Sequence, residues 1–223
     1  MYQKTLAALL LGCAALAATA SALAQDEYYA PPVSWHIAAG YSDPTGQISD
    51  YLQGGYVITG GFTIGDRRDP LGLRGDFSFS SHNATNNFLN YGTNVTGVQV
   101  DSGDGQFFSF SLGPQLRFPL IGGSSFYTYA QIGAYRTSFQ LRQTALDGGS
   151  YCDPFFGSCY SGLYAGQDVV YDDTRTRFGW DVGIGLETPR YYGHSYYIDA
   201  SYHRIEASPQ AIEYIPITLG IRF

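Results

Sequence analysis

The chain ends with the residues Ile215-Pro216-Ile217-Thr218-Leu219-Gly220-Ile221-Arg222-Phe223. Every odd-numbered position in this stretch is large and apolar, whereas the even-numbered positions are Pro, Thr, Gly and Arg. Side chains of a β-strand point alternately to its two faces, so the alternation predicts a strand with one apolar and one polar face. A transmembrane β-barrel is built from such strands, because lipid contacts its outer face and a polar lumen lies inside.

The final strand resembles the C-terminal insertion signal of bacterial outer-membrane barrels, which is amphipathic and ends on an aromatic residue. The residues that carry the resemblance are Ile217, Leu219, Ile221 and Phe223. On these residues, the chain is similar to the small outer-membrane β-barrels of the OmpA/OmpX type. The resemblance implies an all-β fold, an eight-stranded antiparallel up-and-down transmembrane β-barrel in the outer membrane of a Gram-negative cell envelope. It also implies a monomer that is inserted by the barrel-assembly machinery and surrounded by lipid and lipopolysaccharide.

The N-terminus has the features of an export signal. A basic residue, Lys4, precedes an apolar run over 6–18, and Ala22-Leu23-Ala24 has the small-x-small pattern of a signal-peptidase site. We therefore expect a signal peptide over 1–24, cleavage between Ala24 and Gln25, a periplasmic segment over 25–32 and a barrel domain over 33–223. An alternative remains open, because Leu10-Leu11-Gly12-Cys13 resembles a lipoprotein box. In that case Cys13 would be lipidated.

Composition agrees with a barrel and excludes some partners. Aromatic residues make up 16% of the chain and Gly contributes 28 residues; aromatic side chains favour strands. No apolar run after the signal reaches the length of a transmembrane helix. The formal net charge of −7 argues against nucleic acid as a partner.

Alternation along the chain predicts eight strands. The connections between them are alternately long and short, which is typical of barrels with extracellular loops and periplasmic turns. The long connections are expected over 42–53, 81–105 and 143–173, and the last connection, 207–211, is short. The predicted strands cover 33–42, 54–65, 71–81, 106–118, 126–141, 174–188, 195–205 and 215–223. In the fifth, Phe139 and Leu141 have the opposite parity to the outward-facing Ile132, so we expect a bulge or an excursion above the membrane.

The polar faces of these strands carry ionisable residues among small ones, which suits a narrow lumen better than a solvated exterior. A soluble secreted barrel of the lipocalin kind would instead place its apolar residues inside. Eight strands enclose little more than their own side chains, so we expect the charges to pair and plug the lumen; a gated narrow pore is the alternative. The predicted network has a periplasmic tier of Arg74, Asp76, Arg117, Glu187 and Arg222, and a higher tier of Arg177, Asp181, Asp199 and His203.

Small outer-membrane barrels include lipid A-modifying enzymes, so a catalytic role is one alternative for this chain. Asp199, Ser201 and His203 share one face of one strand. A spacing of about 7 Å between such positions is too long for a hydrogen bond between a nucleophile and its base. We therefore expect no catalytic residues, no metal site and no cofactor, and a lipid A-modifying enzyme stays an alternative.

The longest connection, 143–173, combines two cysteines with acidic and aromatic residues. The cell envelope is oxidising, so Cys152 and Cys159 are expected to form a disulfide. Exposed aromatic residues often mark contact surfaces, and this segment holds Tyr151, Phe155, Phe156, Tyr160 and Tyr164. The sequence thus favours a non-catalytic outer-membrane protein that supports envelope integrity or binds an unidentified extracellular ligand through its loops.

Overall fold

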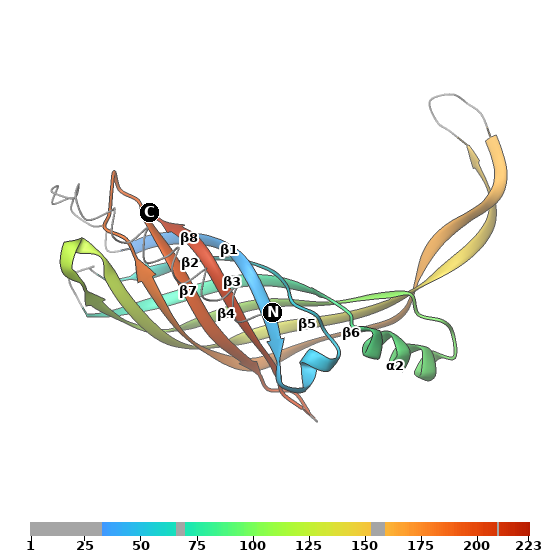
Figure 1. Ribbon diagram of the computed structural model, residues 1–223, viewed down its shortest axis with the longest axis horizontal. Helices are drawn as coiled ribbons and strands as arrows, with labels where there is room; N and C mark the ends of the chain where they lie inside the picture. The colour runs from blue at the N-terminus through green and yellow to red at the C-terminus, as the bar shows by residue number, and fades with distance from the viewer. Residues whose placement is uncertain (1–32, 66–69, 153–158, 209) are drawn as a thin grey trace, which may run out of the picture.

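A computed structural model describes residues 33–65, 70–152, 159–208 and 210–223; side chains at position 96 and over 145–167 are outside this description. Eight antiparallel strands form a closed barrel in sequence order (Figure 1). The predicted signal peptide, the cleavage site at Ala24 and Gln25, Cys13 and the segment 25–32 lie outside the described residues. The strands are β1 (Val33–Thr45), β2 (Gly55–Ile64), β3 (Leu71–Asn83), β4 (Ser102–Pro119), β5 (Ser125–Cys152), β6 (Cys159–Glu187), β7 (Ser195–Ile205) and β8 (Ile212–Arg222).

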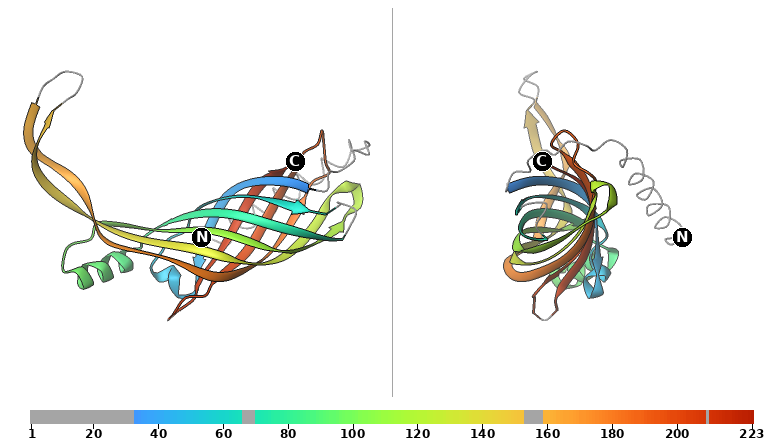
Figure 2. Two further views of the ribbon diagram at one scale, coloured as in Figure 1. Left: turned by 180° about the vertical axis from the view of Figure 1, so that it is seen from behind. Right: turned by 90° about the vertical axis from the view of Figure 1, so that its left-hand side faces the viewer.

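The last strand closes the barrel against the first. β8 pairs with β1 from His36–Arg222 to Thr45–Glu213. Beyond this ladder, the backbone N–H of Trp35 donates to Phe223 at 2.8 Å, and that of Phe223 donates to Trp35 at 2.9 Å. Closure leaves no sheet edge in the lipid, where unpaired backbone groups are costly. The end-on view in Figure 2 shows the resulting ring of strands.

The predicted assignment of faces is confirmed. On β6, Val182 is 42% exposed and Ile184 53%, whereas Asp181, on the opposite face of the same strand, is 1% exposed. The same alternation runs along β4 and β8. Apolar residues therefore face lipid and polar residues face the lumen, which excludes the arrangement of a soluble lipocalin-like barrel.

Two of the predicted loops contain structure that the sequence analysis missed. The connection between β1 and β2 holds the short helix η2 (Gly46–Asp50), and that between β3 and β4 holds α2 (Asn86–Thr96). Thr85 caps α2 by accepting from the backbone N–H of Phe88 at 3.4 Å, and Gly97 ends it with a φ of +73°. Neither feature lies in an apolar-periodic run long enough to stand out. No helix in the described ranges has the length and hydrophobicity needed to cross a bilayer.

The third long connection, expected as a loop over 143–173, is mostly a continuation of two strands. β5 and β6 stay paired from Ser125–Glu187 to Cys152–Cys159 and leave the barrel as a twisted two-stranded ribbon (Figures 1 and 2). A ribbon needs no apolar face, because each strand satisfies its partner's backbone groups on one side. The Gly-rich, acidic composition therefore did not reveal it.

The unusual parity in β5 falls where the strand passes from the barrel into the ribbon, which agrees with the expected excursion above the membrane. A register shift does occur, but only between Leu141 and Arg142, beyond both anomalous residues. Phe139 and Leu141 keep the inward parity of Tyr135, and Leu141 is buried. They point inward because the mouth of the barrel is filled by apolar side chains. The short turns, including η3 (Ile121–Gly123), lie at the other end, which is the periplasmic one.

Candidate functional site

The lumen near the periplasmic end is filled by two arginines that share one carboxylate. Glu187 accepts from Arg117 at 2.8 Å and from Arg222 at 2.7 Å, and these three side chains are almost fully buried. Ser195 donates to the second carboxylate oxygen of Glu187, and Arg222 also lies over the ring of Tyr197. Two cations around one anion give this layer a net positive charge, which the negative layer above offsets.

The next layer crosses the lumen. Arg74 donates to Asp76 at 2.7 Å and to Asp199 at 3.2 Å, and Nε2 of His36 lies 2.6 Å from the other oxygen of Asp76. Tyr127 and Tyr129 both donate to Asp199, at 2.9 and 2.7 Å. Asp199 therefore belongs with Arg74 and not, as the sequence predicted, with the higher group. The strands of a barrel are tilted and staggered, so position along a strand alone does not give height.

The third layer places a serine beside a histidine. Tyr135 donates to Asp181 at 2.8 Å, and its oxygen lies 3.2 Å from Nδ1 of His203. Because Tyr135 gives its proton to Asp181, its oxygen accepts from Nδ1–H and leaves Nε2 to accept from Ser201, at 3.0 Å. The prediction that strand spacing keeps Ser201 and His203 apart is therefore wrong. Side chains on the same face lean toward each other, so backbone spacing overstates the distance between their tips.

The arrangement nevertheless differs from a catalytic triad. Asp199 is occupied by Arg74 and two tyrosines, and Asp181 lies 4.0 Å from His203 Nδ1, beyond hydrogen-bond distance. The lumen cavity that borders Ser201 and His203 has a volume of only about 20 Å³. A space of this size suits one water molecule and leaves no room for a lipid substrate.

Arg177, the remaining predicted member, stays apart from this network. The register places it opposite Tyr135 in β5. It is only partly buried, and its buried Nε has no hydrogen-bond partner among the described residues. The expected pairing of the lumen charges is therefore not seen for Arg177 among the described residues, and Asp181 accepts from Tyr135 instead.

The tyrosines that fill the lumen were not predicted from the sequence. Tyr127, Tyr129, Tyr135 and Tyr197 are all at most 6% exposed. Each ring occupies space above a glycine on a neighbouring strand, where an added Cβ would overlap it. The sequence does contain a pattern that indicates these contacts, because a Tyr-x-Tyr stretch of β5 lies opposite a Gly-x-Gly stretch of β6. Tyr127 is paired with Gly185 and Tyr129 with Gly183. It becomes visible only once the strand register is known.

An apolar cluster covers the polar lumen at the extracellular end. Its buried members come from β4, β5, β7 and β8 and from the segment after η2, and Phe88 of α2 and Phe139 pack against it. Within it, Phe107 stacks on Tyr214, and Tyr214 stacks on His203 with ring centroids 4.7 Å apart. The cluster separates the lumen from the outside. Its buried residues are Leu52, Phe107, Tyr135, Ile205, Ile212 and Tyr214.

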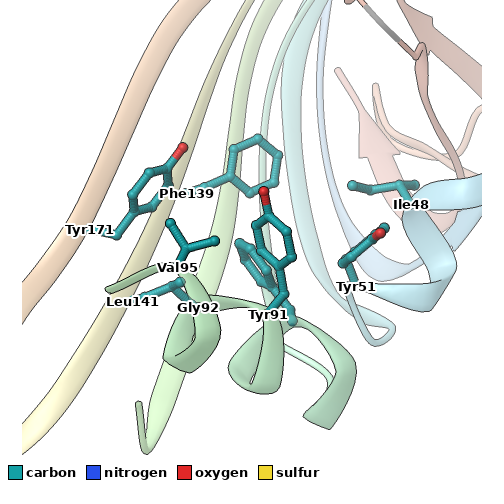
Figure 3. A pocket seen from close by; sticks show the side chains of 9 residues that line it. Ile48, Tyr51, Tyr91, Gly92, Val95, Phe139, Leu141 and Tyr171 are labelled. Carbon is teal, nitrogen blue, oxygen red and sulfur yellow. The ribbon is translucent and has the colours of Figure 1, made fainter. Parts of the chain in front are cut away.

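Above the cluster lies a second, larger hollow between α2, η2 and the base of the ribbon (Figure 3). Its volume is about 240 Å³. Nine residues line it, and none of them carries a charged side chain. They are Ile48, Tyr51, Phe88, Tyr91, Gly92, Val95, Phe139, Leu141 and Tyr171. We refer to it as the α2 pocket. Partial burial, together with the Asp173 carboxylate, raises the pKa of the Tyr171 hydroxyl, so this wall of the pocket stays uncharged.

Other sequence-predicted sites fall partly outside the description. Cys152 and Cys159 are paired positions across the ribbon, but their side chains are not described, so the disulfide stays a prediction. The aromatic side chains of this segment likewise lie outside the description, and Phe155 and Phe156 belong to the stretch 153–158, which the structure does not describe. Among the described residues, no group of His, Cys, Asp and Glu has the geometry of a metal site.

Comparison with known proteins agrees with this architecture. The family model for the outer membrane protein beta-barrel domain matches residues 5–223. Neisserial surface protein A has a solved structure with a TM-score of 0.51 and 13% identity, over 86% of this chain and 96% of that one. Ail of Yersinia pestis, solved in complex with the heparin analogue sucrose octasulfate, has a TM-score of 0.46 and 15% identity, over 86% of this chain and 100% of that one. The N-terminal β-barrel domain of Pseudomonas aeruginosa OprF has a TM-score of 0.38 and 12% identity, over 85% of this chain and 97% of that one.

A search of curated proteins finds no match to this chain. At 13% identity, the likeness to neisserial surface protein A bears on the fold alone. The family match, in contrast, spans nearly the whole sequence. The chain belongs to the outer membrane protein β-barrel domain family and is a protein of the outer membrane.

Proposed function

We propose that this protein is a non-catalytic barrel with a closed lumen that binds a macromolecular partner at the cell surface. The observation that carries the proposal is the ribbon formed by β5 and β6 beyond the barrel (Figure 2). A strand pair that projects this far stabilises no part of the membrane-embedded sheet. It does present a long surface to the outside of the cell.

The ribbon offers open strand edges. β5 pairs with β4 only as far as Arg142, opposite Ser102, and β6 pairs with β7 only as far as Gly179, opposite Ile205. Beyond these points the described parts of the two strands pair only with each other, up to Cys152 and Cys159. An open edge carries unpaired backbone donors and acceptors, to which an extended segment of a partner can add as a further strand.

The edge of β6 between Asp168 and Arg177 has a composition that would select its partner. Arg175 donates to Asp173 at 2.8 Å, and both lie in solvent-accessible positions. Thr174 and Thr176 are exposed between these charges. Charged residues along an edge disfavour indiscriminate pairing with apolar strands, so a polar or oppositely charged extended segment fits this edge best.

The closed lumen supports a binding role over transport or catalysis. Ion pairs and tyrosines fill the barrel in three layers, and the apolar cluster covers them. The hydrogen-bonded pair of Ser201 and His203 faces a cavity of about 20 Å³, which admits no lipid. We therefore expect the purified protein to give no conductance steps in a planar bilayer, and a deletion strain to keep an unchanged lipid A mass spectrum.

The binding role can be tested by shortening the ribbon. Thr144 and Gln167 are paired positions, so residues 145–166 can be replaced by a short hairpin turn without disturbing the barrel. Cells that display the wild-type or the shortened protein are compared for adhesion to a panel of immobilised extracellular proteins and to cells of the same strain. We expect binding by the wild type and weaker binding by the shortened variant, which keeps only the part of the β6 edge between Gln167 and Arg177.

A matched control replaces α2 and its flanks, residues 86–97, by a linker that keeps the ribbon. Surface amounts of all three proteins are equalised by labelling of whole cells. Undiminished adhesion by the shortened variant, or a wild type that binds no more than cells without the protein, would contradict the proposal.

A further inference from the structure

The α2 pocket lies outside the hydrocarbon region of the membrane. Phe139, in its wall, is paired with Asp173 of β6, which forms an ion pair with Arg175. A second pair at this end of the barrel joins Arg142 to Asp104 at 2.8 Å. Charges of this kind are strongly disfavoured in the bilayer core. The pocket is therefore reached from the extracellular medium and not from the acyl chains.

Aromatic rings build most of the pocket and meet at right angles. Tyr51 and Phe88 are 6.0 Å apart with an interplanar angle of 84°, and Phe88 and Phe139 are 6.3 Å apart at 88°. Edge-to-face contacts of this kind are the preferred geometry between aromatic rings. They present both ring faces and ring edges to the interior, which favours a flat aromatic guest over a flexible chain.

The pocket keeps large apolar side chains in contact with water. Tyr91 is 58% exposed and Val95 63%, although both lie on the side of α2 that lines the hollow (Figure 3). Exposed apolar surface that is hollowed in this way marks a ligand site more often than a plain solvent-facing helix. At its rim, Tyr91 and Tyr171 carry hydroxyl groups, which can accept or donate one hydrogen bond.

From this geometry, we propose that the α2 pocket binds a small neutral aromatic molecule of one or two fused rings. An enclosed apolar cavity of about 150 Å³ is large enough for benzene, and the α2 pocket, which is open on one side, has about 240 Å³. The uncharged lining gives an ionised ligand no partner. This role is separate from the partner binding proposed for the ribbon, and the two can fail independently.

The size of the pocket also separates a small molecule from a protein. A stable protein interface covers about 800 Å² on each partner, far more than a hollow lined by nine residues. A one- or two-ring compound, in contrast, would be largely surrounded by Tyr51, Phe88, Tyr91, Phe139 and Tyr171. A polar group on its ring edge would reach the tyrosine hydroxyls at the rim.

The test uses the full-length mature protein in lipid nanodiscs, because detergent would itself enter an apolar pocket. The probe is fluoroindole, followed by the line width of its fluorine NMR signal against empty nanodiscs. We expect saturable binding to the wild type. Val95→Trp places a ring in the pocket and should weaken binding about tenfold.

Val98→Trp is the matched control, because Val98 follows the end of α2 and does not line the pocket. Binding should be unchanged in this variant, and unlabelled indole should displace the probe whereas anionic indole acetate should not. Heat-shifted gel mobility verifies that both variants are folded. Three results would each overturn the proposal: no binding above empty nanodiscs, equal binding by Val95→Trp and wild type, or displacement by the anion as readily as by indole.

Discussion

Arg74 of β3 and Asp199 of β7 meet across the lumen, with 3.2 Å between Nη1 and Oδ2. In a closed barrel of eight strands, the third and the seventh lie on opposite walls. The two side chains are 3% and 5% exposed, so the pair is buried inside the barrel. This ion pair fills the lumen and connects β3 to β7 on the opposite wall, and we refer to it as the strut.

Removing one end of this strut should destabilise the barrel. Asp199→Ala leaves the hydroxyls of Tyr127 and Tyr129 without their acceptor and takes one of two carboxylates from Arg74. Breaking a buried pair costs about 3–5 kcal/mol, and we expect a loss near the lower end because Asp76 still pairs with Arg74. Urea unfolding in lipid vesicles, read from gel mobility, measures the change. The control Asp173→Ala, in the exposed pair with Arg175, should cost less than about 1 kcal/mol; equal losses would contradict the strut.

Gly183 is expected to resist even the smallest side chain. A Cβ there would overlap the Tyr129 ring, so Gly183→Ala should cost about 1–3 kcal/mol through overpacking. Gly60→Ala is the matched control on β2, because its Cβ would meet only the backbone oxygen of His36, at 3.8 Å. Combining Gly183→Ala with Tyr129→Ser should recover part of the loss in a double-mutant cycle. Strictly additive effects of the two changes would exclude a direct conflict between ring and Cβ.

Val182 tests which face contacts lipid. It is 42% exposed near the middle of the part of β6 that pairs with β7, and arginine at an outward midplane position costs about 2–4 kcal/mol in such barrels. Val182→Arg should therefore lower the unfolding free energy by that amount. Val169→Arg, on the ribbon at 53% exposure, should have little effect. A lipid-soluble quencher should also reach a fluorophore at 182 and not one at 181, and the reverse pattern would invert the barrel.

Deleting Phe223 should impair assembly. This residue exchanges two backbone hydrogen bonds with Trp35, at 2.8 and 2.9 Å, where the barrel closes. We expect less heat-modifiable protein in the outer membrane after the deletion, measured by gel shift of membrane fractions. Deletion of Gln99, an exposed residue outside the strands, serves as the control and should leave the yield unchanged. The same yield from both deletions would refute a special role for the terminal residue.

Cys152 and Cys159 should be oxidised to a disulfide in the native protein. They are paired positions in an extracellular ribbon, and closing a loop of this size is worth about 2–3 kcal/mol in the chain-entropy model. Alkylation of the unreduced protein, followed by mass spectrometry, should label neither cysteine. Reduction should leave the unfolding of the barrel nearly unchanged, because the ribbon lies outside the membrane. Two alkylated thiols before reduction would disprove the pairing.

Much of the barrel could be predicted from local alternation. The faces of Val182 and Asp181, the terminal strand up to Phe223 and the inward position of Arg74 all follow from a period of two residues. The ribbon could not be predicted in the same way, because a two-stranded segment in water needs no apolar face. Helix α2 was missed for a related reason, since its caps at Thr85 and Gly97 lie in a segment without long periodicity.

The sequence by itself determined which residues face the lumen and which face lipid, because that choice depends only on parity along each strand. Only the tertiary structure decided the partners within the lumen: Asp199 with Arg74, Ser201 with His203, and Tyr129 above Gly183. Those contacts join strands far apart in sequence. Their heights depend on the tilt and stagger with which the barrel closes, and no local pattern encodes this geometry.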